Sequence, residues 1–116
     1  MATLGFDRAF IKQPSEKKTV RLEYQDVADN MGVGGFSLST ASVKIYDKET
    51  GQECTSAMAE GVVTVDSTNN YVYVTIKAGE SGKRYVAKIV TTWVKVGQPD
   101  QIDEKDLLIR VEEKGL

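Results

Sequence analysis

The sequence predicts an all-β protein, a single immunoglobulin-like β-sandwich of about seven to nine strands that spans residues 1–116 as one domain. Three observations lead to this prediction. The 116 residues include 14 Val, 10 Thr and 6 Ile, whose branched side chains fit a pleated sheet better than a helix. Apolar and polar residues alternate with a period of two in several segments. Turn-forming residues separate these segments at intervals of about 8–12 residues.

The first half of the chain provides three expected strands, near residues 6–12, 19–25 and 41–47. In the second of these, Val20 and Leu22 alternate with polar residues, so one face should lie on a core and the other in water. Residues 25–31 could form a short helical crossing, and a glycine-containing loop follows it. Residues 47–51 contain Asp, Thr and Gly and predict a turn.

The second half provides four more expected strands, near residues 61–66, 71–77, 83–95 and 106–112, after one helical turn at 56–60. The polar run Asp66–Asn70 predicts a hairpin between the first two of these. Tyr85 follows a glycine turn and opens a long alternating strand, which is typical of a tyrosine corner: a buried ring whose hydroxyl bonds the backbone across the turn. The expected core comprises Val20, Leu22, Val43, Ile45, Val63, Val74, Ile76, Tyr85, Ala87, Ile89, Leu107, Ile109 and Val111.

Charge and composition exclude several classes of function. Fifteen Lys and Arg against 17 Asp and Glu give a net charge of -2, without the basic excess of a nucleic-acid binder. No run of 18 apolar residues predicts a membrane span, and Asp7 and Arg8 interrupt the apolar stretch that a signal peptide needs. We therefore expect no nucleic-acid or membrane partner and a location in the cytoplasm.

Catalysis has few candidate residues. The chain has no His, which excludes Ser/His/Asp and Cys/His arrangements, and the single cysteine, Cys54, is expected to fill space. The carboxylates Asp100, Asp103, Glu104 and Asp106 follow Pro99 in what reads as a solvated polar loop, without the spacing of a calcium loop. The glycines of residues 32–36 lack the Lys of a phosphate-binding loop. The sequence predicts no catalytic residue, no metal site and no cofactor.

Three aromatic residues are the candidate interface. Tyr71 and Tyr73 share the outward face of one expected strand, and Trp93, the sole tryptophan, lies near the end of another and is expected to be partly buried. Together they could form a protein-binding surface or a flat platform for sugar stacking. The alternative is a purely structural role, in which the two tyrosines pack against side chains of a neighbouring strand.

The order of segments resembles the small immunoglobulin-like structural proteins of tailed phages and prophages. The resemblance rests on the opening Phe10–Glu16, the strand Val20–Tyr24, the Gly79–Tyr85 turn and the closing Leu108–Glu112. Gln13 and Val27 depart from the family pattern, which has Asp and an aromatic residue at these places. The resemblance implies a virion or virion-assembly protein without enzymatic activity, which docks to capsid or tail proteins or to itself as a homo-oligomer, first in the host cytoplasm and then in the virion.

Two alternatives remain open at the level of sequence. A carbohydrate-binding sandwich would use Tyr71, Tyr73 and Trp93. An enzyme or metal protein would use the carboxylates between Asp100 and Asp106.

Overall fold

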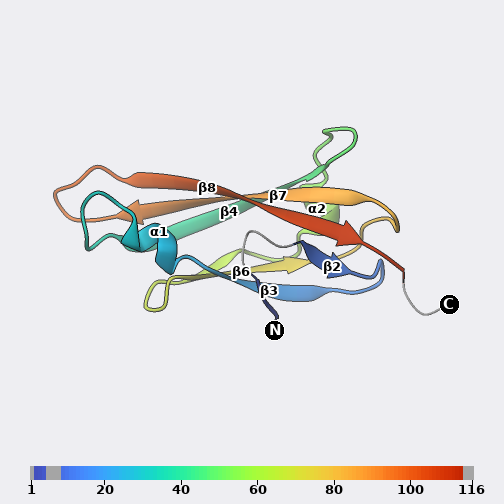
Figure 1. Ribbon diagram of the computed structural model, residues 1–116, viewed down its shortest axis with the longest axis horizontal. Helices are drawn as coiled ribbons and strands as arrows, with labels where there is room; N and C mark the ends of the chain where they lie inside the picture. The colour runs from blue at the N-terminus through green and yellow to red at the C-terminus, as the bar shows by residue number, and fades with distance from the viewer. Residues whose placement is uncertain (1, 5–8, 114–116) are drawn as a thin grey trace.

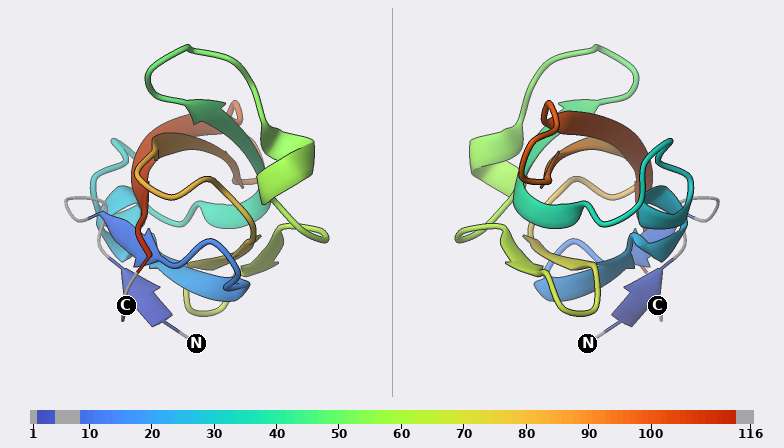
Figure 2. Two further views of the ribbon diagram at one scale, coloured as in Figure 1. Left: turned by 90° about the vertical axis from the view of Figure 1, so that its right-hand side faces the viewer. Right: turned by 90° about the vertical axis from the view of Figure 1, so that its left-hand side faces the viewer.

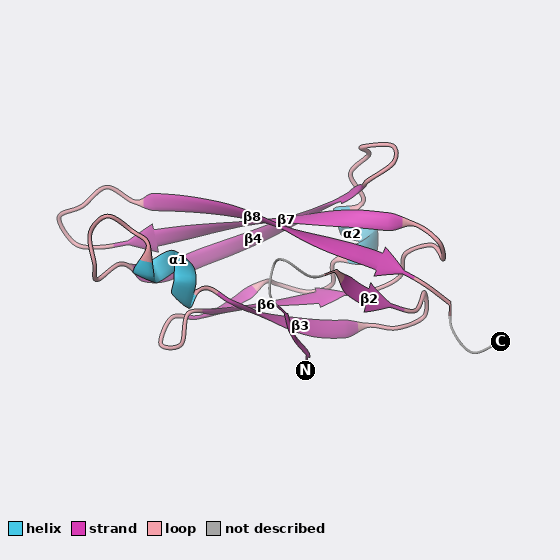
Figure 3. Cartoon of the chain, viewed as in Figure 1, coloured by secondary structure: helices cyan, strands magenta, loops and turns pink. Residues whose placement is uncertain are grey.

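The computed structural model describes residues 2–4, by backbone alone, and residues 9–113 with their side chains. The molecule is elongated and extends 55 Å along its longest axis (Figure 1). Strands are the main secondary structure of the described chain, as the sequence predicts (Figure 3). In this part of the chain, no helix reaches the length and apolar character that crossing a membrane would require.

Two four-stranded sheets make up the fold, in the strand orders β1-β3-β6-β5 and β2-β8-β7-β4. The elements are, in chain order, β1 (Ala2–Leu4), β2 (Phe10–Lys12), β3 (Lys18–Glu23), α1 (Gln25–Asp29), β4 (Ser37–Asp47), α2 (Thr55–Met58), β5 (Thr64–Asp66), β6 (Tyr71–Ile76), β7 (Arg84–Val94) and β8 (Gln101–Val111). The eight strands of the described residues form an all-β sandwich, which confirms the predicted fold class.

The two layers are visible edge-on in Figure 1, with β4, β7 and β8 in one layer and β3 and β6 in the other. Views along the long axis show the sheets curving around a common interior (Figure 2). Most pairings are antiparallel, whereas β1 pairs with β3 and β2 pairs with β8 in parallel. The predicted hairpin at Asp66–Asn70 joins β5 and β6, and Asp66 Oδ1 accepts the backbone N–H groups of Thr68 and Asn69.

The core lies between the sheets, where the inward residues of each strand meet. Eleven of the expected core residues are buried; the buried apolar residues are Phe10, Val20, Leu22, Tyr24, Leu38, Ile45, Met58, Val72, Val74, Ile76, Tyr85, Ala87, Ile89, Trp93, Leu107, Ile109 and Val111. The predictions for Val43 and Val63 were wrong in degree, because both are only half-buried. Val43 lies in the edge strand β4 and Val63 in the loop before β5, so neighbours cover each from fewer sides.

Two strands begin earlier than the sequence predicts. β4 starts at Ser37 rather than residue 41, because a bulge between Leu38 and Thr40 shifts the alternation and hides its period. β8 starts at Gln101 rather than residue 106, since the long partner β7 supplies backbone pairing as far as Trp93. The predicted solvated loop at Asp100–Asp106 is therefore mostly strand. Short helices form at Gln25–Asp29 and Thr55–Met58, close to the two predicted helical turns. Residues 6–8, which belong to the first expected strand, lie outside the described residues.

Candidate functional site

The outer face of the β1-β3-β6-β5 sheet carries an aromatic cluster that we call the tyrosine face: Arg21 from β3 with Tyr71 and Tyr73 from β6. The two rings meet edge to face, with centroids 6.4 Å apart and planes at 83°. The guanidinium of Arg21 lies 4.4 Å from the centroid of the Tyr71 ring, which is within the range of a cation–π contact. Both tyrosines are half-buried, so the cluster is ordered by its own packing yet remains open to a partner.

The β3–β6 register explains this arrangement. Arg21 pairs with Tyr73 and Glu23 pairs with Tyr71, which places the three large side chains on one face at neighbouring positions. The guanidinium also forms an ion pair with Glu23, with Arg21 Nη2 3.5 Å from Glu23 Oε1. The sequence correctly placed the tyrosines on one outward face, but it gave no signal that Arg21 would join them.

The inclusion of Trp93 in the candidate interface was wrong. Its side chain is 0% exposed and packs in the core against Tyr24, with ring centroids 6.4 Å apart. Its indole N–H donates to Thr91 Oγ1 at 2.9 Å, which satisfies the one polar group of the ring inside the core. Because β7 buries every second residue, Trp93 shares the inward face with Tyr85.

The three-ring sugar platform is therefore absent from the described part of the chain. Trp93 cannot reach solvent, and the two remaining rings stand nearly perpendicular instead of lying in one plane. A flat stacking surface needs rings that present their faces in the same direction, and this geometry does not provide one.

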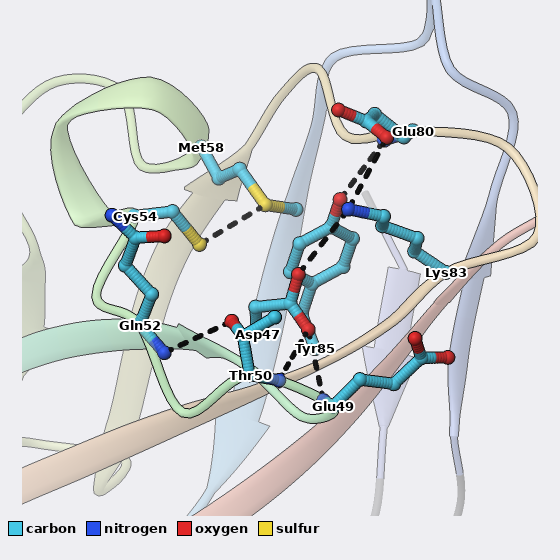
Figure 4. Close-up of polar contacts among 9 residues, drawn as sticks. All are labelled: Asp47, Glu49, Thr50, Gln52, Cys54, Met58, Glu80, Lys83 and Tyr85. Atoms are coloured by element: carbon cyan, nitrogen blue, oxygen red, sulfur yellow. Dashed lines mark hydrogen bonds and ion pairs between the residues drawn. The ribbon is translucent and has the colours of Figure 1, made fainter.

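A groove of about 490 Å³ lies at the end of the sandwich where the turn after β4 meets the loop before β7. Figure 4 shows the contacts that shape it. Asp47 Oδ1 accepts the backbone N–H groups of Glu49 and Thr50 at 2.8 and 3.3 Å. These hydrogen bonds, together with the nearby Lys83 ammonium, hold the pKa of Asp47 below its usual value. The carboxylate is therefore engaged in closing the predicted turn at residues 47–51.

Tyr85 confirms the predicted tyrosine corner at the other wall of the groove. Its ring is 5% exposed, and its hydroxyl accepts the backbone N–H of Glu80 at 3.0 Å. The loop can turn tightly here because Gly79 and Gly82 adopt φ values of +94° and +84°. A Cβ on Gly79 would lie 2.8 Å from Cγ2 of Val111, whereas a Cβ on Gly82 would meet open space.

Cys54 lines the same groove without the features of a reactive thiol. Its Sγ donates to Met58 Sδ at 3.7 Å. Burial, helped by the negative charges of Asp47 and Glu53, raises the pKa of the thiol. A raised pKa lowers the thiolate fraction at neutral pH and with it the nucleophilicity of the sulfur.

The carboxylates considered for metal or acid chemistry do not converge. Asp103 Oδ2 is buried and has no hydrogen-bond partner among the described residues, and burial raises the pKa of Asp103. The neighbouring Lys105 forms an ion pair with Asp26, with Nζ 3.1 Å from Oδ2. Glu104 and Asp106 lie on the opposite, exposed face of β8. Among residues 9–113, no group of three or more Asp, Glu or Cys side chains is placed to hold a metal ion.

Lys12 is a buried polar residue that the sequence did not single out. It is 2% exposed, and its ammonium donates to the backbone carbonyls of Gln13 at 2.6 Å, Pro14 at 3.4 Å and Ala78. Burial lowers the pKa of Lys12, and the charge of Glu16 opposes that shift. The side chain thereby ties the loop after β2 to the loop before β7.

Comparison with known proteins adds no relative. No protein-family model matches the chain, and the comparisons with curated proteins and with solved structures found no significant match.

Proposed function

We propose that this chain is a structural or assembly protein of a tailed phage or prophage, and that it acts by docking to other virion proteins rather than by catalysis. The tyrosine face carries the proposal. Together with Trp, Tyr and Arg are the side chains that are enriched among the residues that dominate binding energy at protein interfaces. Arg21, Tyr71 and Tyr73 combine both types on one rigid sheet.

The phage part of the proposal rests on the order of sequence segments, from Phe10–Glu16 to Leu108–Glu112, that resembles small structural proteins of tailed phages. A β-sandwich is consistent with that resemblance. Repeated copies in a virion would allow each docking contact to be weak and still hold the particle together.

Mass spectrometry of purified virions from a strain that encodes the chain tests the proposal. We expect the chain in the particle in many copies, and we expect the double variant Tyr71→Ala/Tyr73→Ala to be incorporated at least about tenfold less, since each lost anchor costs about 1–2 kcal/mol. Glu104→Ala is the matched control, because Glu104 is exposed on the outer face of the other sheet. The proposal fails if the chain is missing from virions and assembly intermediates alike, or if the double variant is incorporated as well as the control.

A further inference from the structure

The outer side of the β2-β8-β7-β4 sheet, which is the upper layer in Figure 1, gathers positive charge in a chain whose net charge is -2. Side chains alternate between the two faces along β7. Tyr85 and Ala87 are buried in the core, so Arg84, Val86 and Lys88 lie on the outer face. This strand therefore presents a cation on each side of an apolar residue.

β4 presents the same pattern beside β7. Ile45 is buried, so its neighbours Lys44 and Tyr46 lie on the outer face. Lys48 follows the strand directly and is exposed. Its backbone N–H donates to the carbonyl of Arg84 at 3.0 Å, which continues the pairing with β7 for one more residue. We call this surface the basic face; it comprises Lys44, Tyr46, Lys48, Arg84, Val86 and Lys88.

Cations lie opposite cations on the basic face. Lys44 pairs with Lys88 in the β4–β7 register. Lys48 lies opposite Arg84 through the backbone hydrogen bond between them. Like charges at directly opposite positions destabilise a sheet. The requirements of folding therefore do not account for this arrangement, and a ligand of opposite charge would relieve it.

One carboxylate reaches the basic face from within the described chain. Lys88 forms an ion pair with Asp106 of β8, with Nζ 3.4 Å from Oδ1. Lys44, Lys48 and Arg84 form no ion pair with any carboxylate of residues 9–113. Three of the four cations are thus available to the carboxylates of a partner.

Carboxylates border the basic face on two sides. Glu104 and Asp106 lie on the outer face of β8. Glu53 lies opposite Tyr46 on the other side of β4, where its Oε2 accepts the hydroxyl of Thr55 at 3.0 Å. An acidic ligand is repelled at both borders and is attracted between them, so it should run along β4 and β7 rather than across the sheet.

The spacing of the cations matches an extended chain. The Lys44–Lys88 pair and the Lys48–Arg84 pair are four residues apart along the strands, and Tyr46 lies midway. At about 3.4 Å per residue, this separation is about 14 Å. In an extended segment, residues i, i+2 and i+4 point the same way and span the same distance.

We propose that the basic face binds an extended acidic segment of a partner protein, in which two carboxylate residues flank an apolar residue with one residue between each. Each carboxylate lies over one pair of cations, and Arg84 binds its carboxylate through two parallel hydrogen bonds. The apolar residue packs on Tyr46 and Val86, which are both half-buried and so retain exposed surface for this contact.

A single-stranded nucleic acid fits this surface less well. Binding of successive bases on a sheet uses several aromatic side chains, and Tyr46 is the one aromatic residue of the basic face. The aliphatic Val86 beside it offers no ring for stacking. The inference goes beyond the docking function proposed above, because it concerns the other sheet and does not depend on a phage origin.

Fluorescence anisotropy with a labelled synthetic peptide tests the proposal on the purified full chain. The peptide contains Glu-Ser-Leu-Ser-Glu between short serine flanks. At about 50 mM salt we expect a dissociation constant of about 100 µM, which should rise at least threefold at about 200 mM salt because exposed ion pairs are screened. A peptide of the same composition with adjacent Glu residues should bind at least about threefold more weakly. Equal affinity for the two peptides would overturn the spacing on which the proposal rests.

The double variant Lys44→Gln/Arg84→Gln should bind the peptide at least about fivefold more weakly than the wild type. It should fold at least as stably, because it removes repulsion between like charges. Lys17→Gln/Lys18→Gln is the matched control, since it removes the same charge at the start of β3 on the other sheet and should leave binding unchanged.

Three results would overturn the proposal: no peptide binding with the chain at up to about 1 mM, equal weakening by the control variant, or tighter binding of a labelled oligothymidylate than of the peptide. The last result would assign the basic face to nucleic acid. Tyr71→Ala/Tyr73→Ala should bind the peptide as the wild type does, so failure here and failure of the docking proposal are distinguishable.

Discussion

Replacing Gly79 by Ala should destabilise the fold for two separate reasons, which a matched variant can separate. The first reason is backbone conformation: φ is +94°, where a residue with a Cβ is strained by about 1–2 kcal/mol. The second is space. The new Cβ would lie 2.8 Å from Cγ2 of Val111, a buried side chain that is stiff at χ1, and 3.1 Å from Cε of Met58, the flexible end of another buried side chain. Such overpacking costs about 1–3 kcal/mol, so we expect a total loss of about 2–5 kcal/mol.

Gly82→Ala is the matched control, because its φ is +84° and no heavy atom lies within 4 Å of the added Cβ. Only the backbone cost of about 1–2 kcal/mol should remain. Urea unfolding followed by the fluorescence of the buried Trp93 measures both variants, provided that the m-value is unchanged. Equal destabilisation of the two variants would show that the Val111 and Met58 contacts do not constrain the loop, and would refute the packing argument.

Four further predictions concern the same end of the molecule and its loops. Tyr85→Phe should cost about 1 kcal/mol in urea unfolding, because the backbone N–H of Glu80 loses its acceptor in a part-buried hydrogen bond. Lys12→Met should cost about 2 kcal/mol in the same assay, since the carbonyls that the ammonium holds lose their donor; an equally stable variant would contradict this. The pKa of Asp47 is lowered in the folded state from 3.8, so its stabilising contribution is present above that pH and is lost as the pH falls through the folded value. Acid titration of stability should therefore be shallower for Asp47→Asn than for the wild type below about pH 4. Cys54 should react with a thiol reagent more slowly in the native protein than in urea, and equal rates would contradict the raised thiol pKa.

The alternation of side chains was sufficient to predict the sandwich and most of its interior. Strands such as β6, where every second residue is buried, follow a strict period of two, and the sequence records that period directly. The tyrosine corner at Tyr85 was predictable for a similar reason, because a glycine turn and a strand start fix the geometry within a few residues.

The sequence analysis placed Trp93 in the candidate interface, although the alternation along its strand indicated the core. Continuing the inward parity of Tyr85, Ala87 and Ile89 through Thr91 leads to Trp93, so the strand pattern assigned it to the core. The polar Thr91 interrupts the apolar series and hid this continuity. The structure shows why Thr91 is tolerated there: its hydroxyl accepts the indole N–H of Trp93 at 2.9 Å.

Other features depend on contacts that are distant in sequence and leave no local signal. Arg21 joins Tyr71 only through the β3–β6 register, and Lys12 meets the Ala78 carbonyl across 66 positions of chain. The bulge before Thr40 changes parity, so a strand read from alternation alone begins too late. The tyrosine face depends on the β3–β6 register, which explains why the sequence predicted the fold better than the site.

The tyrosine face lies on β3 and β6, on the outer side of one sheet, and leaves the other sheet of the sandwich free of this contact. If the chain docks on a repetitive partner, as we propose, many copies would each make one such contact. Contacts that are weak one at a time would then together hold the assembly, so a modest loss at Tyr71 and Tyr73 should appear as a large loss of incorporation.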